Sequence, residues 1–437
     1  MKQATCRAYL GLLAICVTIA PSLAEAAPSI QITNVPAFGA FGNLGGIVSN
    51  ADPARQRVAI FIYVGGGWYS KPSCAQPLTS IQPDGSWTAN ITPVSSDINA
   101  TIIAALLVSS NYNQPCVQGA SGLPTTVSQQ ALASAYVTRF NPTARQFTFC
   151  DYAWWVKNSA GPAGPGPNYF SDSTNNVWID AAGRLHLRIT HRNSQWQCAE
   201  VISARSFGYG QYRFTVSAAV NSLDPGVVLG LFTWSNDTAY NNREIDVELS
   251  RWNQAFDTND AQFVVQPAAA GQLQRFSVPS GVTNSTYTFT WQPGRVDFQA
   301  MRGDFSSVPP ATNILRTWTC QLGVPPAGGE NMRFNLWLNQ GNPPTNGQEV
   351  EVIFSRFEFV PLGLPQPAQI KSLNWLDGGT QLNLLGQTDR RYQVCTSSNL
   401  INWVQLDRVL ATNDSFQFVD PEPRAADLRF YRAITDP

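Results

Sequence analysis

Three carboxylates alternate with apolar residues in one short segment. Residues 244–248 read EIDVE. In an extended chain successive side chains point to opposite faces, so Glu244, Asp246 and Glu248 share one face. At ~3.3 Å per residue the two outer Cα atoms lie about 13 Å apart. If the two glutamates lean inward on a curved strand, their carboxyls can come within ~5 to 5.5 Å, the separation that suits a nucleophile attacking a sugar carbon and an acid protonating the neighbouring glycosidic oxygen.

Repulsion between these carboxyls would separate their pKa values. Three carboxyls at such range cannot all ionise near neutral pH without a large mutual penalty, so at least one should keep its proton and serve as an acid. A pair with split pKa values is what acid and nucleophile roles require.

A strand face that simply meets water is the alternative interpretation of the same segment. Two tryptophans favour a binding groove, because Trp234 ends the preceding apolar strand and Trp252 follows the acidic one. Large aromatic rings beside carboxylates suit a sugar-binding groove. Tryptophan is also common in sandwich cores, and Trp291 and Trp337 fit that role equally well.

Period-2 patterning predicts strands throughout the middle of the chain. Residues 184–190 alternate fully between polar and apolar types. Further strands are expected at residues 212–216, 227–234, 287–291, 332–338 and 350–359. No helical pattern of ten or more residues separates them, so we expect two large antiparallel sheets packed face to face.

Breaks in composition divide the chain. A stretch with Pro and Arg at 141–146 and a Pro-rich stretch at 361–367 predict boundaries. We therefore expect an N-terminal β-sandwich at 27–140, a catalytic domain at 146–362 and a small C-terminal β-sandwich at 366–437. In the first of these, Trp68, Tyr69 and Trp87 would form a carbohydrate platform if exposed, although composition favours core packing or a spacer.

The first 26 residues have the pattern of a secretory signal peptide. Lys2 and Arg7 precede an apolar run, and small residues at 24–26 offer a cleavage site. The run is too short to span a bilayer, so we expect a secreted or periplasmic protein, with a retained anchor as the alternative. Export permits disulfides, and Cys74 with Cys116 is a candidate pair within one domain.

Composition excludes several classes of protein. With 28 Lys+Arg against 29 Asp+Glu among 437 residues, the chain has no electrostatic footprint for nucleic acid or an anionic membrane. Its two histidines and the absence of a Cys-x-x-Cys pattern give no metal-binding cluster. We expect no cofactor, and a structural Ca²⁺ would leave no readable pattern here.

An ordered set of motifs resembles glycoside hydrolase family 16, the β-jelly-roll glucanases and galactanases. The EIDVE segment is similar to the family's E-x-D-x-E signature. Around it, similar family strands are found at residues 207–214, 230–234, 286–291 and 333–337. The resemblance covers about 200 residues and implies a concanavalin-like jelly-roll sandwich, flanked here by two smaller β-sandwich modules of the kind found in secreted bacterial proteins.

The resemblance also implies roles for individual residues. Glu244 matches the nucleophile, Glu248 the general acid/base and Asp246 the carboxyl that tunes the nucleophile. Candidates for substrate binding are Trp234, Trp252, Trp337 and Asn168.

The sequence thus predicts a secreted, monomeric endo-hydrolase that cleaves β-glycosidic bonds of a glucan or galactan with retention of configuration. A non-catalytic glycan-binding protein on the same fold is the alternative, since fold does not fix function. A structural surface protein with a solvated acidic strand is a third.

Overall fold

The structure is a computed structural model that describes residues 28–306, 309–362, 368–376, 379–388, 390–421 and 429–435. The predicted signal peptide and residues 363–367 of the predicted linker lie outside these ranges. Strands dominate the described residues, and the single α-helix among them is α1 (Thr125–Gln130). Short 3-10 helices are η1 (Ser95–Asn99), η2 (Val220–Ser222), η3 (Thr238–Arg243), η4 (Ala311–Asn313) and η5 (Asn339–Gly341). The all-β prediction is confirmed.

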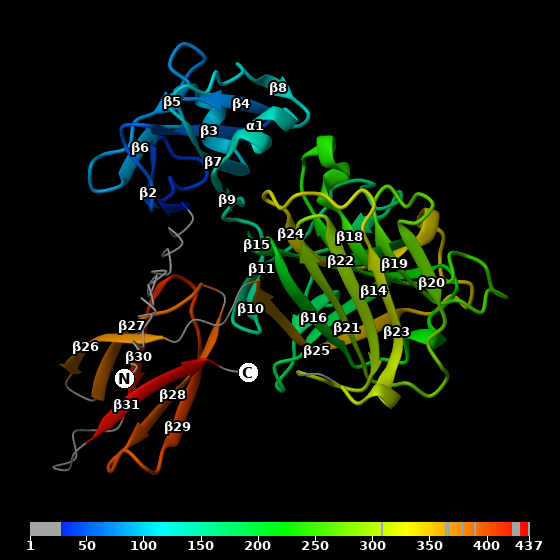
Figure 1. Cartoon of the computed structure of the whole chain (residues 1–437). Helices are drawn as coiled ribbons and strands as arrows, with labels where there is room; N and C mark the ends of the chain where they lie inside the picture. Colours follow the sequence, from blue (N-terminus) through cyan, green and yellow to red (C-terminus); the bar gives the residue numbers. More distant parts are fainter. Residues whose placement is uncertain are drawn as a thin grey trace, which may run out of the picture.

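The middle of the chain forms one bent, sixteen-stranded sheet that folds into two facing layers (Figure 1). The first layer is, in spatial order, β20 (Leu273–Phe276), β19 (Ala261–Val265), β18 (Ile245–Leu249), β17 (Val227–Trp234), β24 (Asn331–Leu338) and β15 (Gln195–Ser206). The second continues with β14 (Leu185–Arg192), β25 (Val350–Pro361), β16 (Gly210–Val216), β21 (Ser285–Gln292), β22 (Arg295–Arg302) and β23 (Ile314–Cys320). Four short strands pair beside this path, namely β10 (Gln146–Phe149), β11 (Tyr152–Val156), β12 (Tyr169–Phe170) and β13 (Val177–Ile179). This is the jelly roll that the motifs predicted.

The apolar faces of the two layers pack into one core. Ile245, Val247 and Leu249 of β18 have no exposed surface. Phe334 of β24 meets Phe214 of β16 edge to face, with ring centroids 5.6 Å apart, so aromatic rings join one layer to the other. Each large apolar side chain buried this way contributes roughly 1.5 to 3 kcal/mol. The carboxylate face of β18 must therefore look away from the core.

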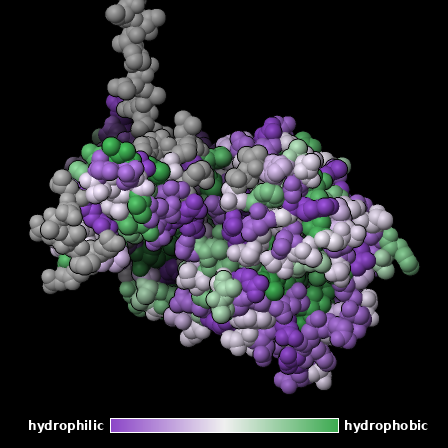
Figure 2. Space-filling view, turned by 90° about the horizontal axis from the view of Figure 1, so that it is seen from below, coloured by the Kyte–Doolittle hydropathy of each residue, from purple (hydrophilic) through white to green (hydrophobic). Residues whose placement is uncertain are grey.

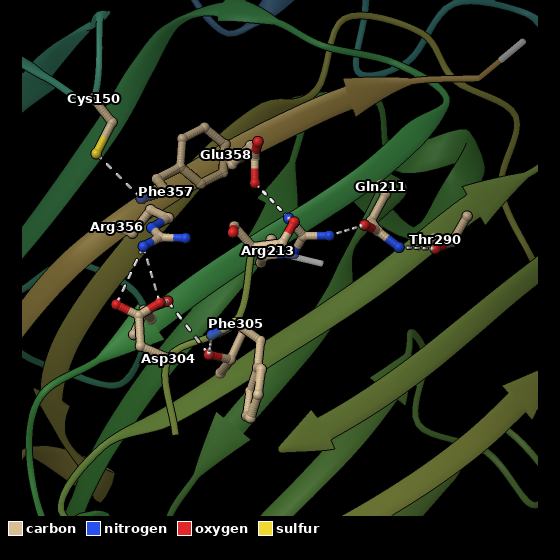
Figure 3. Close-up of polar contacts among 12 residues, drawn as sticks. Cys150, Gln211, Arg213, Thr290, Asp304, Phe305, Arg356, Phe357 and Glu358 are labelled. Atoms are coloured by element: carbon tan, nitrogen blue, oxygen red, sulfur yellow. Dashed lines mark hydrogen bonds and ion pairs between the residues drawn. The ribbon is translucent and has the colours of Figure 1, made fainter. Parts of the chain in front are cut away.

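The outer face of the second layer is covered by a polar network (Figure 3). Arg213 of β16 donates to Glu358 of β25 and to Gln211, 2.7 Å away, and Gln211 donates to Thr290 of β21 at 3.2 Å. Arg356 of β25 forms a further ion pair with Asp304. The side chains of this network are partly or fully exposed, so this face meets solvent.

The N-terminal module consists of strands β1 to β9 and α1. One sheet is β1 (Ser29–Asn34), β2 (Asn43–Ser49) and β6 (Ser86–Asn90), and the other is β8 (Gln118–Ala120), β4 (Gly67–Lys71), β3 (Gln56–Val64), β7 (Ile102–Ser109) and β9 (Ala133–Thr138), with β5 (Leu78–Thr79) beside β3. Cys74 and Cys116 form a disulfide, as proposed. Trp68 and Trp87 are 2% and 3% exposed, so the platform of exposed tryptophans is wrong and the core interpretation holds.

The C-terminal module consists of two three-stranded sheets. They are β26 (Gln369–Leu376), β27 (Gly379–Leu385) and β30 (Ser415–Asp420), and β29 (Val404–Leu410), β28 (Arg391–Ser397) and β31 (Phe430–Thr435). Figure 1 shows the three modules as separate bodies around the β9 to β11 region.

The view of one face and the lengths of the described helices bear on how the molecule meets its surroundings. Seen from below, hydrophobic residues form scattered groups among hydrophilic ones (Figure 2). None of the described helices is both long and apolar enough to cross a bilayer.

Candidate active site

The three carboxylates lie on the concave face of β18, where the alternation of the sequence puts them. Glu244 stands just before the strand, and its carbonyl accepts from the Gln266 amide at 3.1 Å, so the extended backbone continues through it. Glu244 and Glu248 are partly exposed, whereas Asp246 between them is 2% exposed. The outer two can thus reach a ligand, and the central one can act only through its neighbours.

A turn of unusual backbone conformation delivers Glu244 to its place. Asn241, Asn242 and Arg243 have φ of 47°, 60° and 52°. Asparagine tolerates the left-handed region, but arginine does so less readily. Arg243 is held by an ion pair to Asp237, with 2.6 Å between Nη2 and Oδ2, and by a bond to the Pro326 carbonyl at 2.7 Å. Both charged groups are buried, so each depends on the other.

A cavity of about 320 Å³ opens above these carboxylates. Gly230 of β17 pairs with Glu248 on one side and with Asn335 of β24 on the other. A Cβ on Gly230 would lie 2.4 Å from Asn335 Oδ1. Because Gly230 has no side chain, the bottom of the cavity between Glu248 and Asn335 is unobstructed, and a sugar ring can approach the carboxyls there.

The far wall of this cavity is charged. Glu200 of β15 is fully buried and accepts from Lys157 Nζ at 2.8 Å and from Arg333 Nη1 at 3.0 Å. Lys157 Nζ also donates to the Gly164 carbonyl at 2.6 Å, which fixes the Pro- and Gly-rich loop at the rim. The wall is thus preorganised, with its charges compensated before any ligand arrives.

Two buried polar atoms of the lining have no hydrogen-bond partner among the described residues. They are Asn335 Oδ1 and Arg333 Nε. A buried polar group without a partner is costly, and hydroxyl groups of a sugar can both donate to the amide oxygen and accept from the guanidinium. Such atoms indicate where a ligand binds.

Burial raises the pKa of all three carboxyls. Burial first, and then the charge of Glu248, raise the pKa of Glu244 to about 8, while Arg333 and a hydrogen bond with Asp246 oppose that shift. The pKa of Asp246 is raised well above its ordinary value by burial and by both glutamates. Burial raises the pKa of Glu248 to about 7, against a hydrogen bond from Gln262 at 2.7 Å. The three groups titrate together and hold protons at neutral pH that free carboxyls would have lost.

The structure separates the predicted substrate-binding residues into two pairs. Trp234 and Trp337 line the cavity with the carboxylates. Trp252 and Asn168 are not among its lining residues. Trp252 meets Trp337 edge to face at 5.9 Å, and Asn168 is 3% exposed and donates to the carbonyls of Pro165 and Leu338 at 2.7 and 2.8 Å. Both therefore support lining elements from behind.

Sequence reasoning missed several lining residues, namely Lys157, Glu200, Phe232, Arg333 and Asn335. The alternation of residues along the strands could have identified three of them. Phe232 is two residues before Trp234, and Arg333 and Asn335 precede Trp337 in steps of two, so period-2 alternation places them on the faces of those tryptophans. Lys157 lies in a region where no strand was expected.

Comparison with known proteins finds similarity to bacterial beta-glucanases. The chain is 28% identical over 174 residues to a beta-glucanase of Paenibacillus polymyxa and 28% identical over 172 residues to one of Bacillus amyloliquefaciens. Each match covers 38% of this chain and 64% of the relative, so the chain spans less than two thirds of the length of these curated relatives. A solved beta-glucanase of Bacillus licheniformis is 19% identical, with a TM-score of 0.36, over 50% of this chain and 100% of that one.

No family model matches the chain. The beta-glucanase relatives nevertheless match 38% of it, and they support the resemblance to glycoside hydrolase family 16 that the motifs indicated.

Proposed function

We propose that the chain is a secreted endo-β-glucanase that cleaves β-glycosidic bonds by retaining double displacement. The observation that carries the proposal is the placement of Glu244 and Glu248 on either side of buried Asp246, facing one cavity with an open floor at Gly230. The names of the curated relatives favour a β-glucan as substrate.

Glu244 is the nucleophile in this mechanism. Burial and Glu248 raise its pKa to about 8, so only a minor fraction of Glu244 is ionised at neutral pH; Arg333 and the hydrogen bond with Asp246 favour that ionised, reactive fraction. Its carboxylate attacks the anomeric carbon while Glu248 gives its proton to the leaving oxygen, which forms a covalent glycosyl-enzyme and releases the first product. Glu248, now ionised, takes a proton from water, and the resulting attack on the anomeric carbon frees Glu244.

The raised pKa of Glu248 suits this double role. A carboxyl with a pKa of about 7 still carries its proton near neutral pH and can accept one again in the second step. Asp246 remains covered and protonated, and it donates to Glu244. The cavity supplies positioning through the two unpartnered atoms, Asn335 Oδ1 and Arg333 Nε.

The test starts from the purified full chain and a panel of mixed-linkage glucan, laminarin, xyloglucan, agarose and carrageenan. We expect turnover of a β-glucan and loss of ~10³-fold or more in kcat for Glu244→Gln, since an amide keeps the shape but cannot attack carbon. Proton NMR of the first product should show the anomeric configuration of the substrate. Binding of a glucan without turnover would support the glycan-binding alternative instead, and inversion would remove Glu244 as nucleophile.

A further inference from the structure

A second cavity lies beside the catalytic one, between the jelly roll and the N-terminal module. It has a volume of about 250 Å³ and shares Trp234 and Arg333 with the catalytic cavity. Its opposite wall comes from the N-terminal module and the residues that follow it, among them Phe38, Thr101 and Phe140. The two cavities therefore border the same two side chains.

The contact between these two modules is closely packed. In Figure 1, β9 leads from the N-terminal module to the jelly roll beside β15. Thr138 Oγ1 at its end donates to Asn331 Oδ1 of β24 at 3.2 Å, and Phe140 stacks on Trp155 of β11 with ring centroids 4.4 Å apart. Gly329 approaches Tyr136 so closely that a Cβ there would lie 2.5 Å from the Tyr136 ring. The cavity is thus a fixed feature between two docked surfaces.

Phe38 is held in place by a buried guanidinium. Arg139 is 5% exposed, and its nitrogens donate to five backbone carbonyls at 2.9 to 3.2 Å, including those of Pro36 and Ala37. The same guanidinium lies over the Phe38 ring, 5.9 Å from its centroid. The ring is therefore preorganised at the wall of the cavity, which lowers the entropic cost of binding against it.

The chemistry of the lining suits a sugar unit. Sugar rings carry apolar C–H faces, which pack on aromatic rings, and hydroxyls, which need polar partners. Phe38 and Phe140 offer the first, and Asn141, Ser235 and Asn236 of the same lining offer polar partners. The volume is near the ~300 Å³ lower limit of ligand pockets, so it fits one ring rather than a chain segment.

We propose that this cavity between the modules binds one further glycosyl unit of the glucan held in the catalytic cavity, and that Phe38 of the N-terminal module is its specificity-determining residue. The inference rests on the proposed glucan substrate. It makes the N-terminal module part of the substrate groove and not a spacer.

The test measures binding, so that it does not depend on turnover. The full chain with Glu244→Gln is titrated calorimetrically with linear mixed-linkage and laminarin oligosaccharides from the disaccharide to the octasaccharide, and with branched xyloglucan oligosaccharides. We expect affinity to increase with oligosaccharide length until the ligand has one sugar unit more than the catalytic cavity alone can hold. Phe38→Ala should lower affinity for the longer ligands about five- to tenfold relative to the shortest that binds, as expected for one partly buried aromatic contact. A loss confined to branched ligands would place the unit on a side branch, and a loss on linear ones would place it on the main chain; either supports the proposal.

The matched control is Phe41→Ala, three residues along the same segment. Phe41 is 66% exposed and does not line the cavity, so its affinities should equal those of the parent. Ile202→Phe is a second variant, made from the jelly-roll side, that fills the cavity and should reproduce the loss if Phe38→Ala fails to fold. Equal affinity of Phe38→Ala and parent for every ligand, or an equal loss for short and long ligands, would overturn the inference while leaving the proposed function intact. No binding of any oligosaccharide would overturn both.

Discussion

At the scale of single residues, burial of a carboxyl in the site lowers the free energy of unfolding of the protein when that carboxyl is ionised. In the unfolded chain Glu248 titrates near its ordinary value, whereas in the folded chain burial raises its pKa to about 7. Between these two values the folded state binds more protons than the unfolded state, so the free energy of unfolding falls as pH rises through that window. The carboxyl proposed as the general acid, Glu248, therefore weakens the fold most at neutral and alkaline pH.

Replacing this carboxyl should stabilise the protein in a pH-dependent way. We expect the free energy of unfolding of Glu248→Gln to exceed that of the parent at pH 8 by on the order of 1 to 3 kcal/mol, with the difference vanishing near pH 4, where the parent carboxyl is largely protonated in both states. Thermal unfolding from pH 4 to pH 8 measures this. Glu349→Gln is the control, because hydrogen bonding to the His191 amide lowers the pKa of Glu349 and its substitution should not stabilise at pH 8. A pH-independent difference for Glu248→Gln would contradict the assignment.

The turn at the end of η3 shows how one element positions Glu244, the proposed nucleophile. Arg243 holds a left-handed conformation directly before Glu244, and the Arg243 carbonyl accepts from Thr233 Oγ1 at 2.8 Å. Thr233 Oγ1 in turn accepts from the Ile245 amide at 3.1 Å. The Thr233 hydroxyl of β17 thereby bonds two backbone groups on either side of Glu244, in place of strand-to-strand hydrogen bonds.

Removing the partner of Arg243 should disrupt this element. Asp237→Ala leaves a guanidinium with no exposed surface uncompensated, so we expect a loss of about 3 to 5 kcal/mol in the free energy of unfolding. Asp304→Ala removes an ion pair whose side chains are 35% and 42% exposed, and it should cost less than ~1 kcal/mol. Chemical denaturation of both variants decides the matter; similar losses would mean that Asp237 does not hold the turn.

At the scale of the whole molecule, the two flanking modules contact the jelly roll differently. Burial between modules raises the pKa of Tyr136 to about 12, and its ring packs against Gly329. On the C-terminal side, Arg391 forms an ion pair with Asp151 at 2.6 Å, and the Asp151 side chain is 59% exposed. The N-terminal contact therefore depends on packing and the C-terminal contact partly on an exposed charge pair.

This difference predicts unequal effects of substitutions at the two contacts. Tyr136→Ala should lower the unfolding free energy by about 2 to 4 kcal/mol through the void it leaves. Asp151→Ala should change it by no more than ~1 kcal/mol. Scanning calorimetry of the full chain measures both, and Tyr136→Ala should in addition weaken binding of long oligosaccharides if the N-terminal module forms part of the groove. An equal effect of the two substitutions would show that the contacts are alike.

The sequence alone determined which residues share a face, because alternation along a strand is local. It placed Glu244, Asp246 and Glu248 opposite Ile245 and Val247, and the motif order indicated the jelly roll around them. Tertiary structure decided which faces meet. Trp252 follows β18 closely in the sequence yet supports the cavity from behind, whereas Trp337 lines it from a strand almost ninety positions away from Glu248.

The same limit explains the residues that sequence reasoning could not place. Glu200, Arg333 and Lys157 form one charged wall only because β15 pairs with β24 and with β11. Phe38 reaches the neighbourhood of Trp234 only because the N-terminal module docks on the jelly roll. Strand pairing and docking between modules are set by contacts between distant residues, and a single sequence carries the period of each strand but not the identity of its neighbours.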